Sequence, residues 1–126
     1  MFNPKFLEVL KIEVEKAGQK IEWGTKILNF RDKGYSNKTG GFHPVEVMTD
    51  QGKIQYVTDF CYFGPDDELV KDLDFAFNCG VFQQLGRGES LEYPIEEVRD
   101  LFAMLQENFI AYYAMGMYYH IEVETI

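Results

Sequence analysis

The sequence predicts an α+β protein in which an antiparallel β-sheet is flanked by an N-terminal helix and a long C-terminal helix, with a strand at the end of the chain. Three observations support this fold class. Apolar residues recur at helical spacing near each end, apolar and polar residues alternate through the middle, and short glycine-containing turns separate the alternating segments. The 126 residues, 46% of them hydrophobic, are expected to form a single domain over residues 1–126.

A helix is predicted over residues 4–17. Asn3 and Pro4 are typical of a helix start, because an asparagine side chain caps the first amides and proline fits the first turn. Gly18 is expected to end the helix. The expected apolar stripe consists of Leu7, Leu10, Val14 and Ala17, with Phe6 beside it.

The next segment, residues 21–30, is rich in β-formers and is predicted to be the first strand. Ile21, Trp23, Thr25 and Ile27 alternate on one face, and Lys26, Leu28 and Phe30 on the other. Residues 31–41 are rich in glycine and polar residues, so we expect a loop there.

A β-hairpin follows. Residues 45–48 alternate after Pro44, and residues 53–63 alternate again, so each segment is predicted to be a strand. The turn between them, residues 50–52, places Gly52 where positive φ is needed. The second strand is expected to present one face made of Ile54, Tyr56, Thr58, Phe60 and Tyr62.

The middle of the chain is less regular. Residues 64–68 are expected to break the sheet, residues 69–73 to form a short helical turn, and residues 74–84 to form one further strand. Gly80 within that strand indicates a bulge or a close approach of another backbone. Residues 86–88 read as a loop.

A long helix is predicted from Pro94 to residues 115–116, with two glutamates in its first turn, where the helix dipole favours them. Its apolar stripe is Val98, Leu101, Phe102, Leu105, Phe109 and Tyr112. Residues 117–126 alternate again and are predicted to be the final strand.

Charge is distributed unevenly along the chain. There are 12 basic and 21 acidic residues, for a net charge of -9. Residues 1–53 carry a net charge of +2, whereas residues 54–126 carry −11. This balance argues against nucleic acid as a partner, because phosphate binding needs a basic face. We expect solubility, and in addition an acidic face that attracts a basic protein partner or the lysine-rich half of a second copy.

The N-terminus lacks the apolar core of a signal peptide, and the longest uncharged stretch is too short to span a membrane. A cytoplasmic protein with no membrane partner is therefore expected. Cys61 and Cys79 lie in apolar, strand-like surroundings, so both are predicted to be reduced core residues.

No motif in the chain predicts catalysis or a cofactor. His43, His120 and the two cysteines lack metal-ligand spacing, so no metal is expected. Residues 18–26 superficially resemble a phosphate loop, but the spacing is wrong and the segment lies in a predicted strand. A cysteine–histidine pair lacks the local context that activates a thiol. We therefore predict that the protein is not an enzyme.

Two clusters are candidates for binding. The segment 31–44 holds Arg31, Tyr35 and His43 and is the candidate partner or ligand loop; in the simpler interpretation, Tyr35 packs on the sheet. Near the C-terminus, tyrosines and methionines exceed what one small core is expected to bury. The surplus, represented by Tyr113, Met117 and Tyr118, is the candidate oligomer surface.

Several segments together resemble an uncharacterised gammaproteobacterial family, domain-of-unknown-function family 2787. The resemblance is carried by residues 29–36 and 40–47, and by shorter matches at 58–60, 68–69, 73–75, 93–95, 108–109 and 115–117. The family is similar to proteins encoded on mobile genomic islands and, more distantly, to the acidic mitochondrial matrix protein that binds the globular head of complement C1q. That resemblance implies an antiparallel sheet flanked by helices, a ring-like oligomer and a non-enzymatic binding role.

Three functional hypotheses follow. The first is a self-associating, acidic protein-binding module. The second is a small-ligand-binding or enzymatic domain with a pocket at the 31–44 loop, which a cavity lined by Arg31, Tyr35 and His43 would favour. The third is an acidic mimic of nucleic acid that inhibits a nucleic-acid enzyme, which requires carboxylates spaced like phosphates along one face.

Overall fold

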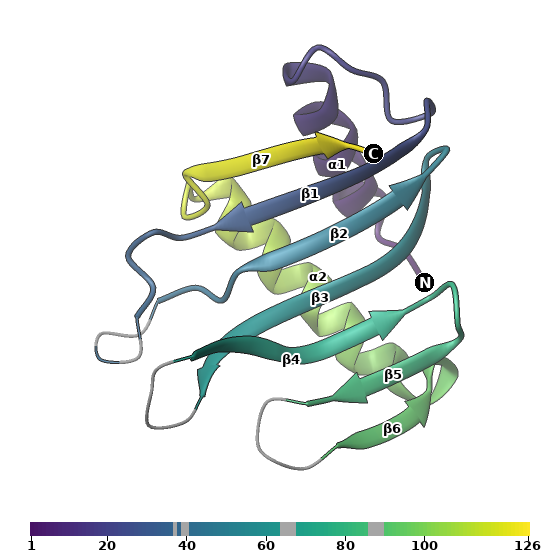
Figure 1. Ribbon diagram of the computed structural model, residues 1–126, viewed down its shortest axis with the longest axis vertical. Coiled ribbons are helices and arrows are strands. Elements are labelled where there is room, and N and C mark those ends of the chain that lie inside the picture. Colours follow the sequence, from purple (N-terminus) through teal and green to yellow (C-terminus); the bar gives the residue numbers. More distant parts are fainter. Residues whose placement is uncertain (37, 39–40, 64–67, 86–89) are drawn as a thin grey trace.

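The computed structural model describes residues 1–36, 38, 41–63, 68–85 and 90–126 (Figure 1). The elements follow the order α1 (Pro4–Lys16), β1 (Thr25–Arg31), β2 (Val45–Asp50), β3 (Lys53–Phe63), β4 (Glu68–Ala76), β5 (Val81–Gln84), β6 (Leu91–Pro94), the 3₁₀ turn η1 (Ile95–Val98), α2 (Arg99–Ala114) and β7 (His120–Thr125). The predicted break at 64–68 and loop at 86–88 fall almost wholly outside the described residues.

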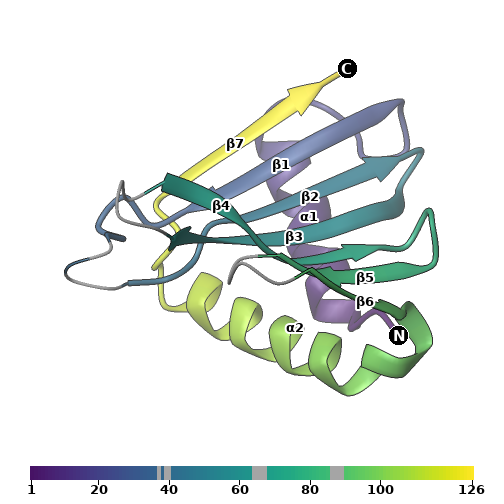
Figure 2. The same cartoon turned by 60° about the horizontal axis from the view of Figure 1, so that its bottom comes forward.

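The strands form one antiparallel sheet of seven strands in the order β6-β5-β4-β3-β2-β1-β7. Consecutive strands are neighbours from β1 to β6, and the last strand returns to pair with β1 (Figure 1). Both helices lie on the same face of the sheet, and α2 runs across several strands (Figures 1 and 2). The predicted α+β fold class, with its N-terminal helix, long C-terminal helix and final strand, is confirmed.

The core lies between the sheet and the two helices, and phenylalanine dominates it. Its fully buried rings are Phe6, Phe30, Phe75, Phe82, Phe102 and Phe109. Phe109 of α2 contacts Phe6 of α1 and Phe30 of β1, with ring centroids 5.1 and 4.8 Å apart. Burying each such side chain is worth about 1.5–3 kcal/mol. These contacts fix α2 against the sheet.

The first helix matches its prediction, apart from its buried face. Asn3 caps it by accepting a hydrogen bond from the Lys5 amide, and Gly18 follows its end at φ +77°. The buried residues of the helix are Phe6, Val9, Leu10, Glu13 and Val14, whereas Leu7 is exposed. The predicted stripe was therefore shifted, because Phe6 rather than Leu7 faces α2.

The first strand begins later than predicted, at Thr25 instead of residue 21. Turns occupy the preceding residues, and Gly24 takes φ +72°, which is not a strand conformation. Trp23 is consequently exposed rather than part of the sheet. The composition of this segment favours strand, but the sheet has no partner strand for it.

The hairpin between β2 and β3 is confirmed, with Gln51 and Gly52 at φ 49° and 81°. A register shift makes Gln55 an extra residue in β3, since Met48 pairs with Tyr56 and Thr49 with Ile54. This β-bulge puts Ile54 in the core. The prediction that Ile54 shares a face with Tyr56 was wrong for that reason.

The region after β3 differs most from the prediction. Residues predicted as a helical turn, 69–73, belong to strand β4, which pairs with β3 from Phe63 down to Val57. Residues 74–84 form the end of β4 and all of β5, separated by a turn in which Gly80 takes φ +70°. Gly80 marks a turn between two strands, so the predicted single strand is not present there. The Ile95 amide does approach the Gly80 carbonyl, to which it donates at 3.0 Å, but nothing lies within 4 Å of the position that a Cβ would take at Gly80.

The long C-terminal helix also begins later than predicted. Residues 91–94 form edge strand β6, residues 95–98 form a 3₁₀ turn, and α2 starts at Arg99. Pro94 ends β6, where it costs no ladder hydrogen bond that the sheet needs. The residue before a proline prefers extended backbone, which suits Tyr93 in a strand. No helix within the described part of the chain has both the length and the apolar character that crossing a membrane demands.

Candidate functional site

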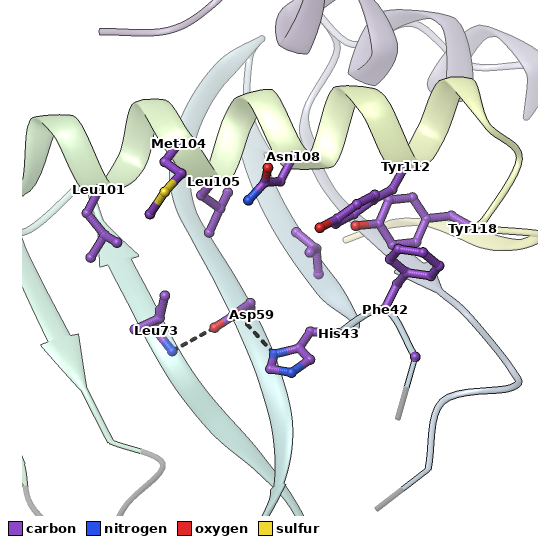
Figure 3. Close-up of a pocket in the computed structure, with 12 residues that line it drawn as sticks. Phe42, His43, Asp59, Leu73, Leu101, Met104, Leu105, Asn108, Tyr112 and Tyr118 are labelled. Carbon is purple, nitrogen blue, oxygen red and sulfur yellow. Dashed lines mark hydrogen bonds and ion pairs between the residues drawn. The ribbon is translucent and has the colours of Figure 1, made fainter. Parts of the chain in front are cut away.

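A cavity of about 330 Å³ lies between α2 and the sheet (Figure 3). We call it the α2 cavity. Its lining residues are Gly41, Phe42, His43, Val45, Asp59, Leu73, Leu101, Met104, Leu105, Asn108, Tyr112 and Tyr118. Most of the wall is aliphatic or aromatic. The titratable pair His43–Asp59 lies on the sheet side, apart from the Asn108 amide of α2 and the hydroxyls of Tyr112 and Tyr118 (Figure 3).

One face of α2 forms the roof of the cavity. Its lining positions are Leu101, Met104, Leu105, Asn108 and Tyr112, and each of them has another three or four residues away. This spacing places side chains on a single face of a helix, and Figure 3 shows them pointing toward the sheet. The amphipathic pattern of α2 therefore supplies both core residues and cavity wall.

Three adjacent strands form the floor. Val45 of β2 pairs with Asp59 of β3, and Asp59 pairs with Leu73 of β4. Residues directly opposite one another in a ladder point to the same side of the sheet. All three side chains therefore face α2, and Asp59 is a carboxylate placed on the core side of the sheet.

Asp59 and His43 form the polar end of the α2 cavity. The Leu73 amide donates to Asp59 Oδ1 at 2.8 Å, and His43 Nδ1 lies 3.3 Å from Asp59 Oδ2 (Figure 3). The Asp59 side chain is 13% exposed and that of His43 is 42% exposed. The hydrogen bond to Asp59 raises the pKa of His43 against the opposing effect of burial, with further help from the charges of Asp59 and Asp72.

Asp72 completes a group of donor side chains at this end. One donor atom from each of His43, Asp59 and Asp72 lies within 4.8 Å of the others. Asp72 is 9% exposed. An imidazole and two carboxylates are groups that can bind a divalent cation.

Aromatic rings line one side of the cavity, next to His43 (Figure 3). Phe42 lies 4.3 Å from Tyr112 between ring centroids, and Tyr112 lies 6.4 Å from Tyr118. Tyr118 is 5% exposed, and burial raises its pKa. The cavity thus has a ring-lined side, which carries two tyrosine hydroxyls, and a charged side (Figure 3).

The candidate loop residues separate into two places. His43 lines the α2 cavity, whereas Arg31 and Tyr35 line a second hollow of about 530 Å³ with Asp32, Lys33, Pro44, Tyr62, Leu69, His120 and Glu122. Tyr35 stacks on Tyr62 at 5.0 Å, accepts a hydrogen bond from its amide, and contacts the ring of His43 at 5.1 Å. Tyr35 therefore packs on the sheet, and its ring lies between the two hollows.

The C-terminal aromatic cluster is more buried than predicted. Tyr118 belongs to the core, so its assignment to an oligomer surface was wrong. Tyr113 is half-buried and donates a hydrogen bond to Glu13, and Met117 is half-buried. The exposed members of the cluster are Met115 and Tyr119. The core between the sheet and the helices therefore buries more of these tyrosines than the sequence analysis predicted.

The cysteines are not joined in a disulfide. Cys61 is half-buried in β3, but Cys79 is exposed in the turn before β5, so its prediction as a core residue was wrong. His120 pairs with Glu122 at 2.7 Å, away from the α2 cavity.

Sequence reasoning missed Asp59 and Asp72. The available signal was an aspartate inside an otherwise apolar and aromatic strand, residues 53–63, where a charge is costly unless it has partners. The alternation expected for β3 starts from Ile54, and the bulge at Gln55 reverses it. A regular alternation from Ile54, with no bulge, places Asp59 on the face of the sheet that points away from the helices.

Comparison with known proteins identifies relatives of unknown function. The family model "Protein of unknown function (DUF2787)" matches residues 4–124. The hypothetical protein VC0508 from the Vibrio cholerae pathogenicity island VSP-II is 32% identical, with a TM-score of 0.83 over 99% of this chain and 93% of its own.

A second solved structure has the same sequence identity to this chain. The conserved hypothetical protein VC1805 from Vibrio cholerae pathogenicity island VPI-2 is 32% identical, with a TM-score of 0.79 over 98% of this chain and 94% of its own. That protein is described as sharing structural homology with the human P32 protein. No curated protein matches the chain.

Proposed function

Because the chain belongs to the DUF2787 family, whose function is unknown, we propose a function from the site itself: the protein binds a small, largely apolar molecule in the α2 cavity. The observation that carries this proposal is the combination of a mostly apolar cavity under α2 with a hydrogen-bonded His43–Asp59 pair in its wall. Ligand sites in proteins commonly have this composition.

The size of the cavity limits the ligand. A volume of about 330 Å³ is near the lower end of the range of about 300–1,000 Å³ for small-molecule sites. Phe42, Tyr112 and Tyr118 offer ring surface for an aromatic or branched aliphatic body. His43 and Asp59 can orient one polar group. The ligand class is therefore a compact apolar molecule with a single polar end.

The proposal is one of binding without turnover. Asp59 engages Nδ1 of His43 and so orients the ring for proton transfer at Nε2. The described residues that line the cavity include no serine, threonine, cysteine or lysine that the ring could activate as a nucleophile. The surrounding wall from α2 is mainly aliphatic. These features suit recognition of a polar group in an apolar chamber.

A blocking substitution tests the proposal. Asn108 is exposed and lines the cavity, so Asn108→Trp is expected to fill it with little effect on folding. Protein-observed NMR with a library of compact molecules, each carrying one polar group, should give hits that shift the signals of Leu73 and Leu105. The same hits should produce no shifts in Asn108→Trp.

The matched control is Glu107→Trp, which adds the same ring at the neighbouring exposed position outside the cavity. It should bind the hits as the wild type does. Equal binding by the two tryptophan variants, or a library without a hit at the α2 cavity, would count against the proposal.

Self-association is a second candidate, and an edge strand favours it. Strand β6 is at the end of the sheet, all four of its residues are exposed, and its apolar Leu91 and Tyr93 are each 40% exposed. Open sheet edges with apolar side chains pair readily with another chain. We propose that β6 pairs with β6 of a second copy and so extends the sheet.

Light scattering at increasing concentration tests self-association. Leu91→Lys should shift the mass toward the monomer, because a charge on an edge strand disfavours pairing. Leu7→Lys is the matched control, since Leu7 is also 40% exposed but lies on α1. A wild-type protein that stays monomeric at every concentration, or equal effects of the two lysines, would refute this route.

A further inference from the structure

Three side chains of types that can bind metal ions converge from separate parts of the chain. His43 precedes β2, Asp59 lies in β3 and Asp72 lies in β4, and one donor atom from each is within 4.8 Å of the others. The three segments are neighbours in the sheet. Sheet topology, rather than local sequence spacing, brings the donors together.

A β-bulge positions Asp72. Asp59 pairs with Leu73 while Phe60 pairs with Lys71, so Asp72 is an extra residue in β4. In a regular strand, Asp72 would point to the face opposite to that of its neighbour Leu73, which lines the α2 cavity. The bulge instead brings its carboxylate near Asp59 and His43. Bulges that re-aim a side chain are over-represented next to functional sites.

The same bulge orients Asp59. The Leu73 amide donates to Asp59 Oδ1 at 2.8 Å, which leaves Oδ2 directed at His43. The backbone amide fixes the orientation of the Asp59 carboxylate, and hydrogen bonds of this kind orient the ligands of known metal sites. Asp59 and Asp72 therefore owe their arrangement to a single local feature of the β3–β4 ladder.

From this geometry we propose that His43, Asp59 and Asp72 bind a divalent transition-metal cation. This inference deepens the proposed function and rests on it, since the ion would sit at the polar end of the α2 cavity and hold the polar group of the ligand. One imidazole and two carboxylates suit ions such as Zn²⁺, Co²⁺ or Mn²⁺. Three protein ligands also leave a coordination position open, as in metal sites that accept exogenous molecules.

Little movement is needed to close the site. Ligands that each lie about 2.1 Å from one ion are at most about 4.2 Å from one another. The donor atoms now lie within 4.8 Å of one another, so each donor pair has to shorten by about 0.6 Å at most. The ion takes the place of the proton between His43 and Asp59.

Cobalt titration of the metal-free full chain tests the inference. Co²⁺ alone is followed by visible absorption and calorimetry, because its spectrum distinguishes nitrogen and oxygen ligands from thiolates. One equivalent should bind without a thiolate charge-transfer band. His43→Gln and Asp72→Asn, which keep side-chain size and hydrogen bonding close to the original, should each weaken binding at least about tenfold.

His120→Gln is the matched control, because His120 also lies beside a carboxylate, Glu122, but outside the three-residue group. It should bind Co²⁺ as the wild type does. The inference is overturned if His43→Gln keeps wild-type affinity, if His120→Gln loses as much, or if a thiolate band appears.

The Asn108→Trp variant separates this inference from the proposed function. It should lose the small molecules and keep Co²⁺, because Asn108 is not among the three donors. Wild-type protein that binds the molecules but not Co²⁺ would refute the metal site alone. Wild-type protein that binds Co²⁺ but none of the molecules would refute the proposed function alone.

Discussion

At the residue scale, Tyr113 shows how a buried carboxylate is accommodated. Glu13 of α1 is 8% exposed, and its Oε2 accepts hydrogen bonds from the Tyr113 hydroxyl of α2 and from Lys16. A buried carboxylate is tolerated only when such donors are present. Burial, followed by the hydrogen bond to Glu13 and its charge, raises the pKa of Tyr113 to about 12.

This contact predicts a loss of stability at alkaline pH. An unfolded tyrosine titrates near pH 10, so between about pH 10 and pH 12 the folded state holds a proton that the unfolded state has lost. The free energy of unfolding should therefore fall as pH rises through this interval. In Tyr113→Phe, which cannot titrate, the fall between pH 9 and pH 11 should be smaller, as measured by urea unfolding.

Glu13→Gln provides the comparison for that experiment. It keeps a hydrogen-bond acceptor for Tyr113 and removes the charge, so its fall in stability should lie between those of the wild type and Tyr113→Phe. If Tyr113→Phe loses as much stability as the wild type over this range, the proton is not held where the structure indicates.

At the element scale, the start of α1 depends on one asparagine with two roles. The Asn3 side chain accepts a hydrogen bond from the Lys5 amide at 2.9 Å, which caps the helix. Its own amide donates to Gln106 Oε1 of α2 at 2.7 Å, and Gln106 Nε2 donates to the Met1 carbonyl at 2.9 Å. Gln106 is 2% exposed, so its buried side-chain amide links the N-terminal residues to α2.

Removing the cap should have a modest effect on stability. Asn3→Ala loses the side-chain acceptor but keeps the backbone bond to Gln106, so the free energy of unfolding should drop by about 1 kcal/mol. Asn3→Ser should restore most of the loss, because serine caps about as well as asparagine. Urea unfolding of the three proteins measures both changes, and an Asn3→Ala variant as stable as the wild type would show that the cap contributes nothing.

Elements with strong local signals could be predicted, and those without them could not. The Asn3–Pro4 start, the Gly18 end and the Gln51–Gly52 turn each have a local physical cause, so α1 and the β2–β3 hairpin were predicted closely. Strands β4 and β6 depend on hydrogen bonds to neighbouring strands. The residue types in these two segments do not distinguish a helical turn from a strand. Pairing with the neighbouring strand of the sheet decides between the two conformations.

At the scale of the whole molecule, both helices cover the same face of the sheet, and the core residues lie between the helices and that face. The ring contacts link Phe6, Phe30 and Phe109 across α1, β1 and α2. Tyr118 joins the same cluster at 5.3 Å from Phe109. The aromatic content that composition assigns partly to an interface between copies is therefore largely used inside one chain.

The same arrangement creates the α2 cavity. Near Leu101 to Tyr112 the helix stands over β2, β3 and β4 and leaves a space that the side chains do not fill. The polar end of this space is built from residues that are distant in the chain. His43 was a candidate because it lies in a glycine-containing loop segment with other polar and aromatic residues. Asp59 and Asp72 lie within strand segments, where no motif marks them as site residues.

The sequence by itself determined the fold class, the two helices, the hairpin and the acidic charge balance, because each follows from residue type, periodicity or local capping. The tertiary structure alone decided which side of the sheet Asp59 and Asp72 face and that they meet His43. The physical reason is that a β-bulge changes the face of every later residue in its strand, and bulges are set by pairing between strands, which no local pattern encodes.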